Sequence, residues 1–397
     1  MTRIPCSRRL PLGARIGVAA LLPLAAAGAW TSTHAAAPRV PSDPGVTSNS
    51  ILFGQSVPQS GSAALYGQST AGIQAYFDAI NAHGGVKGHK LQLKMYDDQY
   101  LPAIARQNTV KLVDQDHVFA TVGMNGSAAI KADLTVLEPA GVPLISPHSG
   151  ATYLQSPFVK TVYLSWPAYK SEGQLLAKYA MRSLHAKKMG IIYQNDDYGK
   201  SLRSGVIAMG VSPAADISYD LSQDDFSAQA EQMKTKGVDA VFVLASPGKA
   251  VSFLNAMANI NYHPQKLMSQ ASALPTFYSS SPKEFPGSYV ASFIPPLLAN
   301  SSNAQVKAFL SDMSKYQSGK PASIFAAWGY MDAQIAVAGL QHIDGSVTRS
   351  AYMAALNGLK NLQTLGGSIS YSSTNHHGLQ DTSIVKAGPT AFQPVNG

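Results

Sequence analysis

Cysteine is nearly absent from this chain of 397 residues, because the single Cys6 lies in a basic leader. The remainder is therefore predicted to contain no disulfide and no cysteine metal ligand. Charged residues make up only 13% of the chain, and no Lys/Arg cluster with interleaved aromatic residues occurs, which argues against nucleic-acid binding. The sequence also lacks the G-x-S-x-G, H-E-x-x-H, P-loop and G-x-G-x-x-G patterns. No catalytic constellation is recognised, and we expect a protein that is not an enzyme.

The adjacent pair His376-His377 is the only local hint of a metal site. Neighbouring residues on a strand point to opposite sides, and no carboxylate or cysteine completes a ligand set nearby. We therefore expect neither a metal nor another cofactor.

No apolar run is long enough for a permanent membrane anchor. Four arginines precede the apolar segment 16–30, which Pro23 interrupts and which is shorter than the roughly 20 residues of a membrane span. Small residues follow at 33–37, so residues 1–36 are predicted to be a signal peptide cleaved near Ala35 or Ala36. Both general secretory and twin-arginine export remain open. We expect a periplasmic protein that is not embedded in the membrane, with residues 37–50 as a flexible N-terminus.

The remaining residues exceed one ordinary core and predict two domains. Short apolar runs alternate with helical stripes, which indicates an α/β protein with parallel sheets covered by helices on both faces. The candidate buried strands are 51–57, 91–96, 118–122, 143–146, 189–193, 240–244 and 289–293. Three helical stripes are centred on Leu176, Phe253 and Phe309.

The most informative segment is a predicted strand, Gly/Ser loop, helix, Gly-rich turn and second strand between Phe53 and Asp98. The helix carries an apolar stripe that includes Ile73, Phe77 and Ile80. The ligand-facing loop of such a unit lies at the carboxyl ends of the strands, here residues 58–66. This segment, and the order of motifs over about 51–392, resemble the branched-chain amino-acid (Leu/Ile/Val) binding protein family, the periplasmic receptors of ABC importers.

The resemblance implies the two-lobed type I periplasmic-binding-protein fold, with two doubly wound parallel sheets joined by three hinge crossovers near Trp166, Ile294 and Gly367. Lobe 1 is then 51–166 plus 294–366, and lobe 2 is 167–293 plus 367–392. A ligand in the cleft favours closure by touching both lobes. The implied partners are a small molecule and the membrane subunits of an ABC permease, with the receptor itself a monomer.

On the first lobe, the resemblance assigns ligand contacts to two strand ends. Ser127 begins a helix after a buried strand, where free N–H groups favour an anionic group, so it is expected to hold a carboxylate; a plain helix cap is the alternative. The next strand end supplies His148, Ser149 and Gly150. Gly150 stands where the family has threonine, so that hydroxyl is lost, and Ser149 or Thr152 is the candidate replacement.

On the second lobe, the resemblance places Tyr198 against the ligand from the opposite side. The family's next tyrosine corresponds to Ser246, and its ammonium-pairing glutamate corresponds to Ala271. A buried ammonium without an anion costs several kcal/mol. The departure at Ala271 therefore favours a small organic or aromatic carboxylate over the usual branched-chain amino acids. Tyr66 and Phe325 are the expected apolar walls.

The leading hypothesis is an exported solute-binding receptor that delivers a carboxylate-bearing ligand, amino-acid-like or aromatic, to a permease. One alternative is a secreted hydrolase or lyase that uses His148 and Ser149. Another is a periplasmic sensor for a signalling receptor, which has the same fold. The residues alone do not separate uptake from sensing.

Overall fold

The structure is a computed structural model that describes residues 43–61, 63–272, 276–379 and 382–395. The predicted signal peptide and residues 37–42 of the predicted flexible N-terminus lie outside these ranges. All the elements below belong to one compact unit, Val40–Gly397.

The first sheet is parallel throughout and has the order β2-β1-β3-β4-β5. Its strands are β1 (Ser50–Val57), β2 (Lys90–Asp97), β3 (Ala120–Val122), β4 (Leu144–Ile145) and β5 (Val162–Tyr163). The strand order reverses between β1 and β3, and ligands of open α/β sheets bind beyond the carboxyl ends of the strands at such a point. The loops after β1 and β3 meet there. We call this sheet and its helices the first lobe.

The second sheet has the order β14-β13-β10-β9-β8-β6-β7. Its strands are β6 (Met189–Gln194), β7 (Ala215–Tyr219), β8 (Ala240–Leu244), β9 (Gln265–Met268), β10 (Tyr289–Ser292), β13 (Ser383–Ala387) and β14 (Phe392–Pro394). The five strands β6 to β10 pair in parallel, whereas β13 and β14 add antiparallel pairs at one edge. The order reverses between β6 and β8. We call this sheet and its helices the second lobe.

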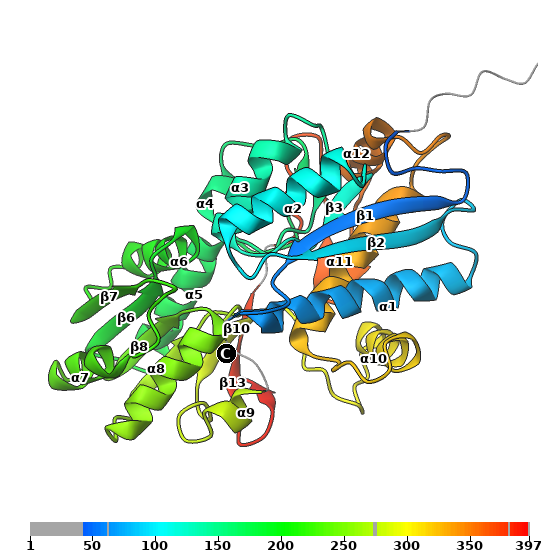
Figure 1. Ribbon diagram of the computed structural model, residues 1–397. Coiled ribbons are helices and arrows are strands. Elements are labelled where there is room, and N and C mark those ends of the chain that lie inside the picture. The colour runs from blue at the N-terminus through cyan, green and yellow to red at the C-terminus, as the bar shows by residue number, and fades with distance from the viewer. Residues whose placement is uncertain (1–42, 62, 273–275, 380–381, 396–397) are drawn as a thin grey trace, which may run out of the picture. The chain divides into compact units, whose positions relative to one another are not determined.

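Helices cover both faces of each sheet, as the alternating pattern predicts. Figure 1 shows α2 and α3 on one face of the first sheet and α1 and α11 on the other. The first lobe contains η1 (Ala64–Gln68), α1 (Ser69–Ala82), α2 (Pro102–Asp114), α3 (Ser127–Leu137), α4 (Thr152–Gln155), α10 (Ala304–Tyr316), α11 (Ile324–Gln341) and α12 (Arg349–Gly358). The second contains α5 (Tyr169–Arg182), α6 (Asp197–Ala208), α7 (Ser227–Thr235), α8 (Pro247–Asn259) and α9 (Phe277–Ser280).

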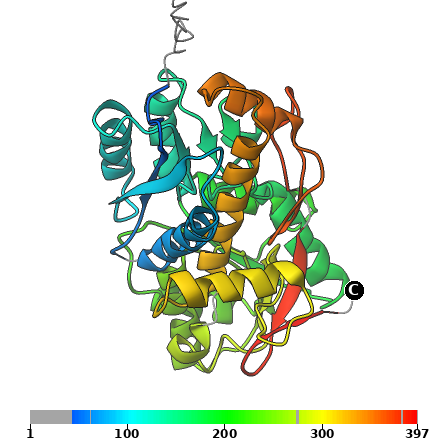
Figure 2. The ribbon, with the colours of Figure 1, turned by 90° about the vertical axis from the view of Figure 1, so that its right-hand side faces the viewer.

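Two glycines bring α1 and α11 unusually close (Figures 1 and 2). A Cβ added to Gly72 would lie 1.8 Å from the carbonyl oxygen of Ala326, and one added to Gly329 would lie 1.9 Å from that of Ser69. Only glycine lets the two backbones pack at this distance. The contact fixes the start of α11, and therefore Trp328, beside the loop that carries Tyr66.

The chain crosses between the sheets at three places, and one differs from the prediction. The segment after Gly367 does not enter the second lobe. It forms the hairpin β11 (Leu362–Thr364) and β12 (Gly367–Ile369) and then runs beside β5, where Leu164 N donates to the carbonyl of His376 at 2.9 Å. The third crossover therefore lies between Leu379 and Ser383. An isolated parallel bridge between Leu164, just after β5, and His377 keeps the segment in the first lobe.

Residues 43–50 also differ from the flexible N-terminus that was predicted. The backbone N–H of Leu52 donates to the carbonyl of Gly45 at 2.8 Å, and the carboxylate of Asp43 accepts a hydrogen bond from the backbone of Arg349. These contacts hold the segment against the first lobe. Its Pro/Ser/Gly composition gave no sign of them.

Candidate functional site

A small cavity lies where loops at the carboxyl ends of both sheets meet. Its volume is about 10 Å³, room for roughly one water molecule. The lining residues are Tyr66, Tyr100, Asn125, Gly126, Ser127, His148, Trp166, Tyr169, Tyr198, Ala271 and Trp328. Both lobes contribute to this set. An organic ligand therefore requires the lobes to separate or the aromatic side chains to move.

The helix α3 presents its N-terminus to the cavity. Ser127 is its first residue and is buried, and no side chain caps the helix. The first intrahelical bond runs from Ile130 N to Gly126 O, so the N–H groups before Ile130 have no helical acceptor. The Ser127 hydroxyl lies 2.8 Å from that of Ser149. This group of donors suits a carboxylate.

His148 lines the cavity but has partners on both ring nitrogens. Its Nε2 lies 2.6 Å from Oδ2 of Asp332 in α11, and both side chains are fully buried. Its Nδ1 lies 3.4 Å from Nδ2 of Asn125. Burial raises the pKa of Asp332, and the neighbouring imidazole partly offsets this effect. His148 therefore acts on the cavity through its neighbours more than as a free donor.

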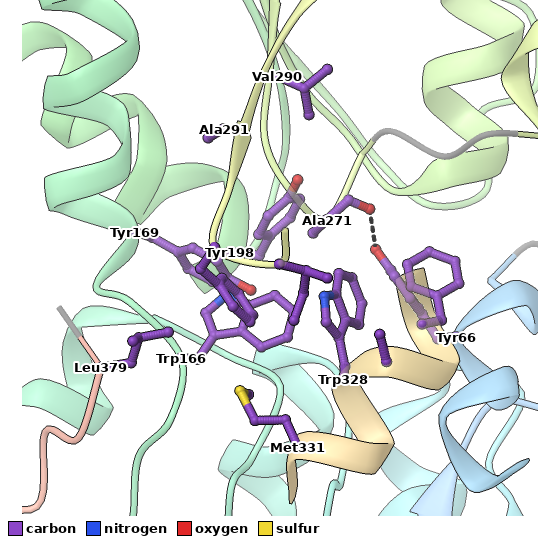
Figure 3. Close-up of a cluster of buried hydrophobic side chains, with 14 of the residues drawn as sticks. Tyr66, Trp166, Tyr169, Tyr198, Ala271, Val290, Ala291, Trp328, Met331 and Leu379 are labelled. Carbon is purple, nitrogen blue, oxygen red and sulfur yellow. Dashed lines mark hydrogen bonds between the residues drawn. The ribbon is translucent and has the colours of Figure 1, made fainter. Parts of the chain in front are cut away.

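An aromatic cluster fills the space between the lobes (Figure 3). The ring centroids of Trp166 and Trp328 lie 4.5 Å apart in a T-shaped contact, and those of Tyr169 and Tyr198 lie 5.1 Å apart. Tyr66 packs on Trp328 at 6.2 Å. Such pairs contribute about 0.5–1.5 kcal/mol each beyond their burial. The walls of the cavity are therefore apolar and stabilise one another.

The phenol groups of Tyr66 and Tyr198 are both hydrogen-bonded. Tyr66 donates to the carbonyl of Ala271 at 2.9 Å, the dashed bond in Figure 3. The Tyr198 hydroxyl lies 3.1 Å from that of Ser272 and 3.3 Å from the carbonyl of Ala245. Burial raises the pKa of both phenols, so they are uncharged polar groups at neutral pH.

Gly150 is required by a close approach of backbone and leaves no room for the family's threonine. A Cβ at this position would lie 2.0 Å from the carbonyl oxygen of Pro167. The carbonyl of Gly150 accepts a 2.8 Å hydrogen bond from Tyr169 N. The absence of a side chain at Gly150 therefore allows the loop after β4 to pack directly on the segment at Pro167 and Tyr169, which crosses to the second lobe. Thr152, one candidate replacement, is bonded to Ser201.

Four of the predicted site residues are buried beside the cavity and are not among the residues that line it. Phe325 packs behind Tyr66 and Trp328, at centroid distances of 5.0 and 4.5 Å. Ser149 bonds Ser127, and Gly150 packs on the crossing chain. The N–H of Ser246 donates to the phenol oxygen of Tyr219 at 3.0 Å, and its buried hydroxyl has no partner among the described residues.

His148 and Ser149 do not form a nucleophile and base pair in this arrangement. The ring nitrogens of His148 contact Asp332 and Asn125, while the Ser149 hydroxyl contacts Ser127. The hydrolase alternative gains no support from these contacts.

Six residues that line the cavity were not predicted as site residues from the sequence: Tyr100, Asn125, Gly126, Trp166, Tyr169 and Trp328. Trp328 was assigned to packing because aromatic residues at helical spacing usually face a core. Asn125 had an available signal, since it immediately precedes the Gly-Ser start of α3 at a strand end. Tyr169 had none, because it opens a helix of the other lobe.

A buried carboxylate that the sequence did not reveal lies behind the second-lobe wall. Glu172 of α5 accepts a 3.0 Å hydrogen bond from the backbone N–H of Gln270, next to Ala271, and its Oε2 has no partner within the described residues. Burial raises the pKa of Glu172 to about 7. Asp98, in contrast, accepts bonds from Ser56 and Tyr100 N and supports its own loop.

Other parts of the described chain provide weaker candidates for a functional site. A hollow of about 320 Å³ lies beside the crossover at 294–298, but its lining is mainly apolar. Among residues 43–61, 63–272, 276–379 and 382–395, no group of three or more His, Cys, Asp or Glu is placed to hold a metal. No helix in the part that the structure describes is long and apolar enough to span a bilayer.

Comparison with known proteins gives a consistent result. The profile of a family described as periplasmic binding protein matches residues 50–391. An amino acid binding protein of Pseudomonas aeruginosa is 27% identical over 197 residues, which cover 48% of this chain and 53% of that protein. The aligned part thus spans about half the length of several curated relatives.

Solved structures extend the similarity over nearly the whole chain. A possible leucine/isoleucine/valine-binding protein from Rhodopirellula baltica SH 1 has a TM-score of 0.82 at 22% identity, covering 90% of this chain and 98% of that one. A fatty acid ABC transporter substrate-binding protein from Thermomonospora curvata has a TM-score of 0.80 at 22% identity, with coverages of 89% and 94%. These likenesses confirm the predicted two-lobed α/β fold.

Proposed function

This chain belongs to the periplasmic binding protein family, and we propose that it is the exported solute receptor of an ABC importer. It captures a small carboxylate-bearing organic ligand between its lobes and delivers it, chemically unchanged, to a membrane permease. Residues 1–36 direct export and are removed near Ala35 or Ala36. Mass determination of the protein recovered from a periplasmic fraction tests this last point.

The observation that carries the proposal is the uncapped, buried start of α3 at the cavity. Ser127 adds a hydroxyl to the free N–H groups of this helix, and Ser149 adds a second hydroxyl within 2.8 Å. A carboxylate accepts from these N–H groups and from the Ser127 hydroxyl, which Ser149 contacts from outside the cavity lining, and it also gains from the helix dipole. Tyr66, Tyr198 and the two tryptophans then surround the apolar part of the ligand.

The site supports a ligand other than leucine, isoleucine or valine. In the first lobe, a Cβ at Gly150 would clash with the carbonyl of Pro167, and in the second, Ala271 brings no carboxylate to the cavity wall. An α-ammonium held here lacks the usual paired anion and pays several kcal/mol in desolvation. One structural neighbour is named as a substrate-binding protein for fatty acids, and a fatty acid is a carboxylate without an ammonium.

A thermal-shift screen tests the proposal. Purified protein is scanned against aliphatic acids, aromatic acids, amino acids, amides and polyols. A ligand present at 100 times its Kd adds about 2.7 kcal/mol of stability and raises Tm by several degrees. We expect hits among carboxylates, and we expect Ser127→Ala to weaken them. Ser288→Ala, a buried serine of the second lobe that bonds the carbonyl of Glu284, is the matched control and should leave them unchanged.

Three outcomes contradict parts of the proposal. Hits confined to polyols or amides exclude the carboxylate. Hits confined to leucine, isoleucine and valine show that the departure at Ala271 does not select the ligand. Turnover of a hit in a coupled assay shows an enzyme. Uptake of a confirmed hit by cells with and without the gene distinguishes transport from the sensing alternative.

A further inference from the structure

Two side chains in the cavity wall have a buried hydrogen-bonding atom without a partner among the described residues, the donor Nε1 of Trp166 and the acceptor Oδ1 of Asn125. Asn125 lies in the loop between β3 and α3, is 4% exposed, and lines the cavity next to Ser127. Its Nδ2 faces Nδ1 of His148 at 3.4 Å. Its Oδ1 is buried and has no partner among the described residues. An acceptor that is buried without a partner destabilises the protein, so a ligand donor at this point is favoured.

The contacts of His148 determine which atom of the Asn125 amide is free. The Nδ2 of Asn125 faces Nδ1 of His148, and because an amide nitrogen only donates, Nδ1 is the acceptor of this contact. The other ring nitrogen, Nε2, then carries the hydrogen and donates to Oδ2 of Asp332 at 2.6 Å. The amide is thereby oriented with Oδ1 away from His148. Asp332 and His148 act on the cavity as positioning residues, through Asn125.

A parallel bridge between Asn125 and His148 fixes this geometry from the backbone as well. The N–H of His148 donates to the carbonyl of Met124 at 2.8 Å, which joins the two strand-end loops. The amide therefore sits on a rigid support, as a selective polar contact requires.

We propose that Asn125 Oδ1 accepts a hydrogen bond from a neutral donor on the ligand, so that the ligand is a 2-hydroxy acid. This inference rests on the proposed function, because it takes the carboxylate at the start of α3 as given. A hydroxyl beside that carboxylate reaches the wall next to Ser127 and satisfies Oδ1. An ammonium is less suitable as the partner of Oδ1, because the Asn125 amide carries no charge to compensate it. A 2-oxo group offers only acceptors and repels Oδ1.

The ionisable groups around the site are consistent with an uncharged donor. Tyr66, Tyr100, Tyr169 and Tyr198 line the cavity with phenols whose pKa burial raises. The remaining carboxylate is Glu172, which lies behind Tyr169 and Tyr198 and accepts from Gln270 N. Oε2 of Glu172 and Oδ1 of Asp332 are both carboxyl oxygens without a partner among the described residues, and the test includes variants of both residues.

The experiment measures Kd by calorimetry for matched sets of four acids that share one side chain, either 2-methylpropyl or benzyl. The members carry hydroxyl, oxo, amino or no substituent at C2. Wild type is expected to bind the 2-hydroxy acid about tenfold tighter than the unsubstituted and 2-oxo acids, the value of one buried hydrogen bond. In Asn125→Leu the hydroxy and unsubstituted acids should differ by less than about twofold. The unsubstituted acid should keep its affinity, which shows that the variant is folded.

Two further variants separate selection from structure. Asn125→Asp places an anion at the same point and should make the 2-amino acid the preferred member. Asp332→Asn places an amide against Nε2 of His148 that can either donate or accept, so either ring nitrogen can carry the hydrogen, both orientations of the Asn125 amide become accessible, and discrimination between hydroxy and oxo acids should fall. A merely structural role for Asp332 would lower all affinities together.

Equal binding of hydroxy and unsubstituted acids by wild type overturns the inference. So does a preference for the 2-amino acid that Glu172→Gln abolishes, since Glu172 is then the selecting group. In both cases carboxylates still bind, and the proposed function survives. Both the inference and the proposed function are contradicted only if no carboxylate in the thermal-shift screen binds.

Discussion

The phenol of Tyr66 donates a 2.9 Å hydrogen bond to the carbonyl of Ala271, which lies 205 positions further along the chain. Tyr66 belongs to η1 in the first lobe, and Ala271 follows β9 in the second. The bond therefore joins the two lobes directly across the cavity. Separation of the lobes must break it, and a ligand that enters must replace it or fit beside it.

Removal of this bond should favour the separated arrangement of the lobes. Tyr66→Phe keeps the ring contacts with Phe325 and Trp328 but loses a bond with a net value of about 1 kcal/mol, a population change of roughly fivefold. The distance between spin labels on α3 and α6 measures the effect. Tyr330→Phe is the matched control, because it removes a phenol bond to Asp312 within the first lobe. An unchanged label distance in Tyr66→Phe contradicts the prediction.

The glycine at 150 should resist restoration of the family's threonine. Gly150→Ala places a Cβ 2.0 Å from the carbonyl oxygen of Pro167, and overpacking of this kind costs about 1–3 kcal/mol or more. We expect Tm to fall by about 1–4 °C, and by more again in Gly150→Thr. Gly358→Ala is the control, since nothing lies within 4 Å of its Cβ. Equal Tm values for the two alanine variants would refute the clash.

Much of the fold could be read from hydrophobic patterning. All seven predicted strands occur, and the strand 240–244 has the predicted bounds, because a run of five fully buried residues leaves no ambiguity. The strands β5, β7, β9 and β11 to β14 were missed. β5 has only two residues, and β7 alternates in exposure with polar residues at Asp216 and Ser218. The antiparallel edge formed by β13 and β14 depends on long-range pairing that local periodicity does not encode.

The candidate site could be predicted from the sequence only in part. Tyr66, Ser127, His148, Tyr198 and Ala271 line the cavity, because the loops at carboxyl ends of parallel strands converge and can be aligned with the family. Partners that lie far apart in sequence were not visible. The contact between His148 and Asp332 spans 184 residues, and only the packing of α11 against α1 places its carboxylate there.

Stability should depend on pH through Glu172. Burial raises its pKa to about 7 in the folded protein, above the usual value of 4.5. The folded state therefore binds the proton more tightly than the unfolded state does. The stabilising contribution of the protonated group is complete below about pH 4.5 and is lost as the pH rises through about 7. Ionisation of Glu172 is thus expected to destabilise the protein above neutral pH.

Glu172→Gln removes this dependence, because its amide oxygen still accepts from Gln270 N and never ionises. We expect the variant to match wild type near pH 5 and to exceed its Tm by several degrees at pH 8. Calorimetric scans across this range measure the difference. Asp98 and Asp133 also have buried carboxyl groups, but both are present in wild type and in the variant, so their effect on Tm cancels in the difference between the two proteins. Glu138 is exposed, so the dependence of Tm on pH in Glu138→Gln should be parallel to that of wild type. A parallel dependence in Glu172→Gln would contradict the raised pKa of Glu172.

Tryptophan fluorescence should report directly on the cavity. The chain contains three tryptophans, and Trp30 lies in the predicted leader, outside the described residues. The other two, Trp166 and Trp328, line the same cavity with their rings 4.5 Å apart. Any ligand that enters must change the surroundings of both rings. A ligand identified by the thermal screen should therefore alter the emission of wild type, and Trp166→Phe and Trp328→Phe should each retain part of the response. The double variant should bind the ligand by calorimetry with no change in emission, whereas a full response in either single variant would mean that the ligand contacts only one of the two rings.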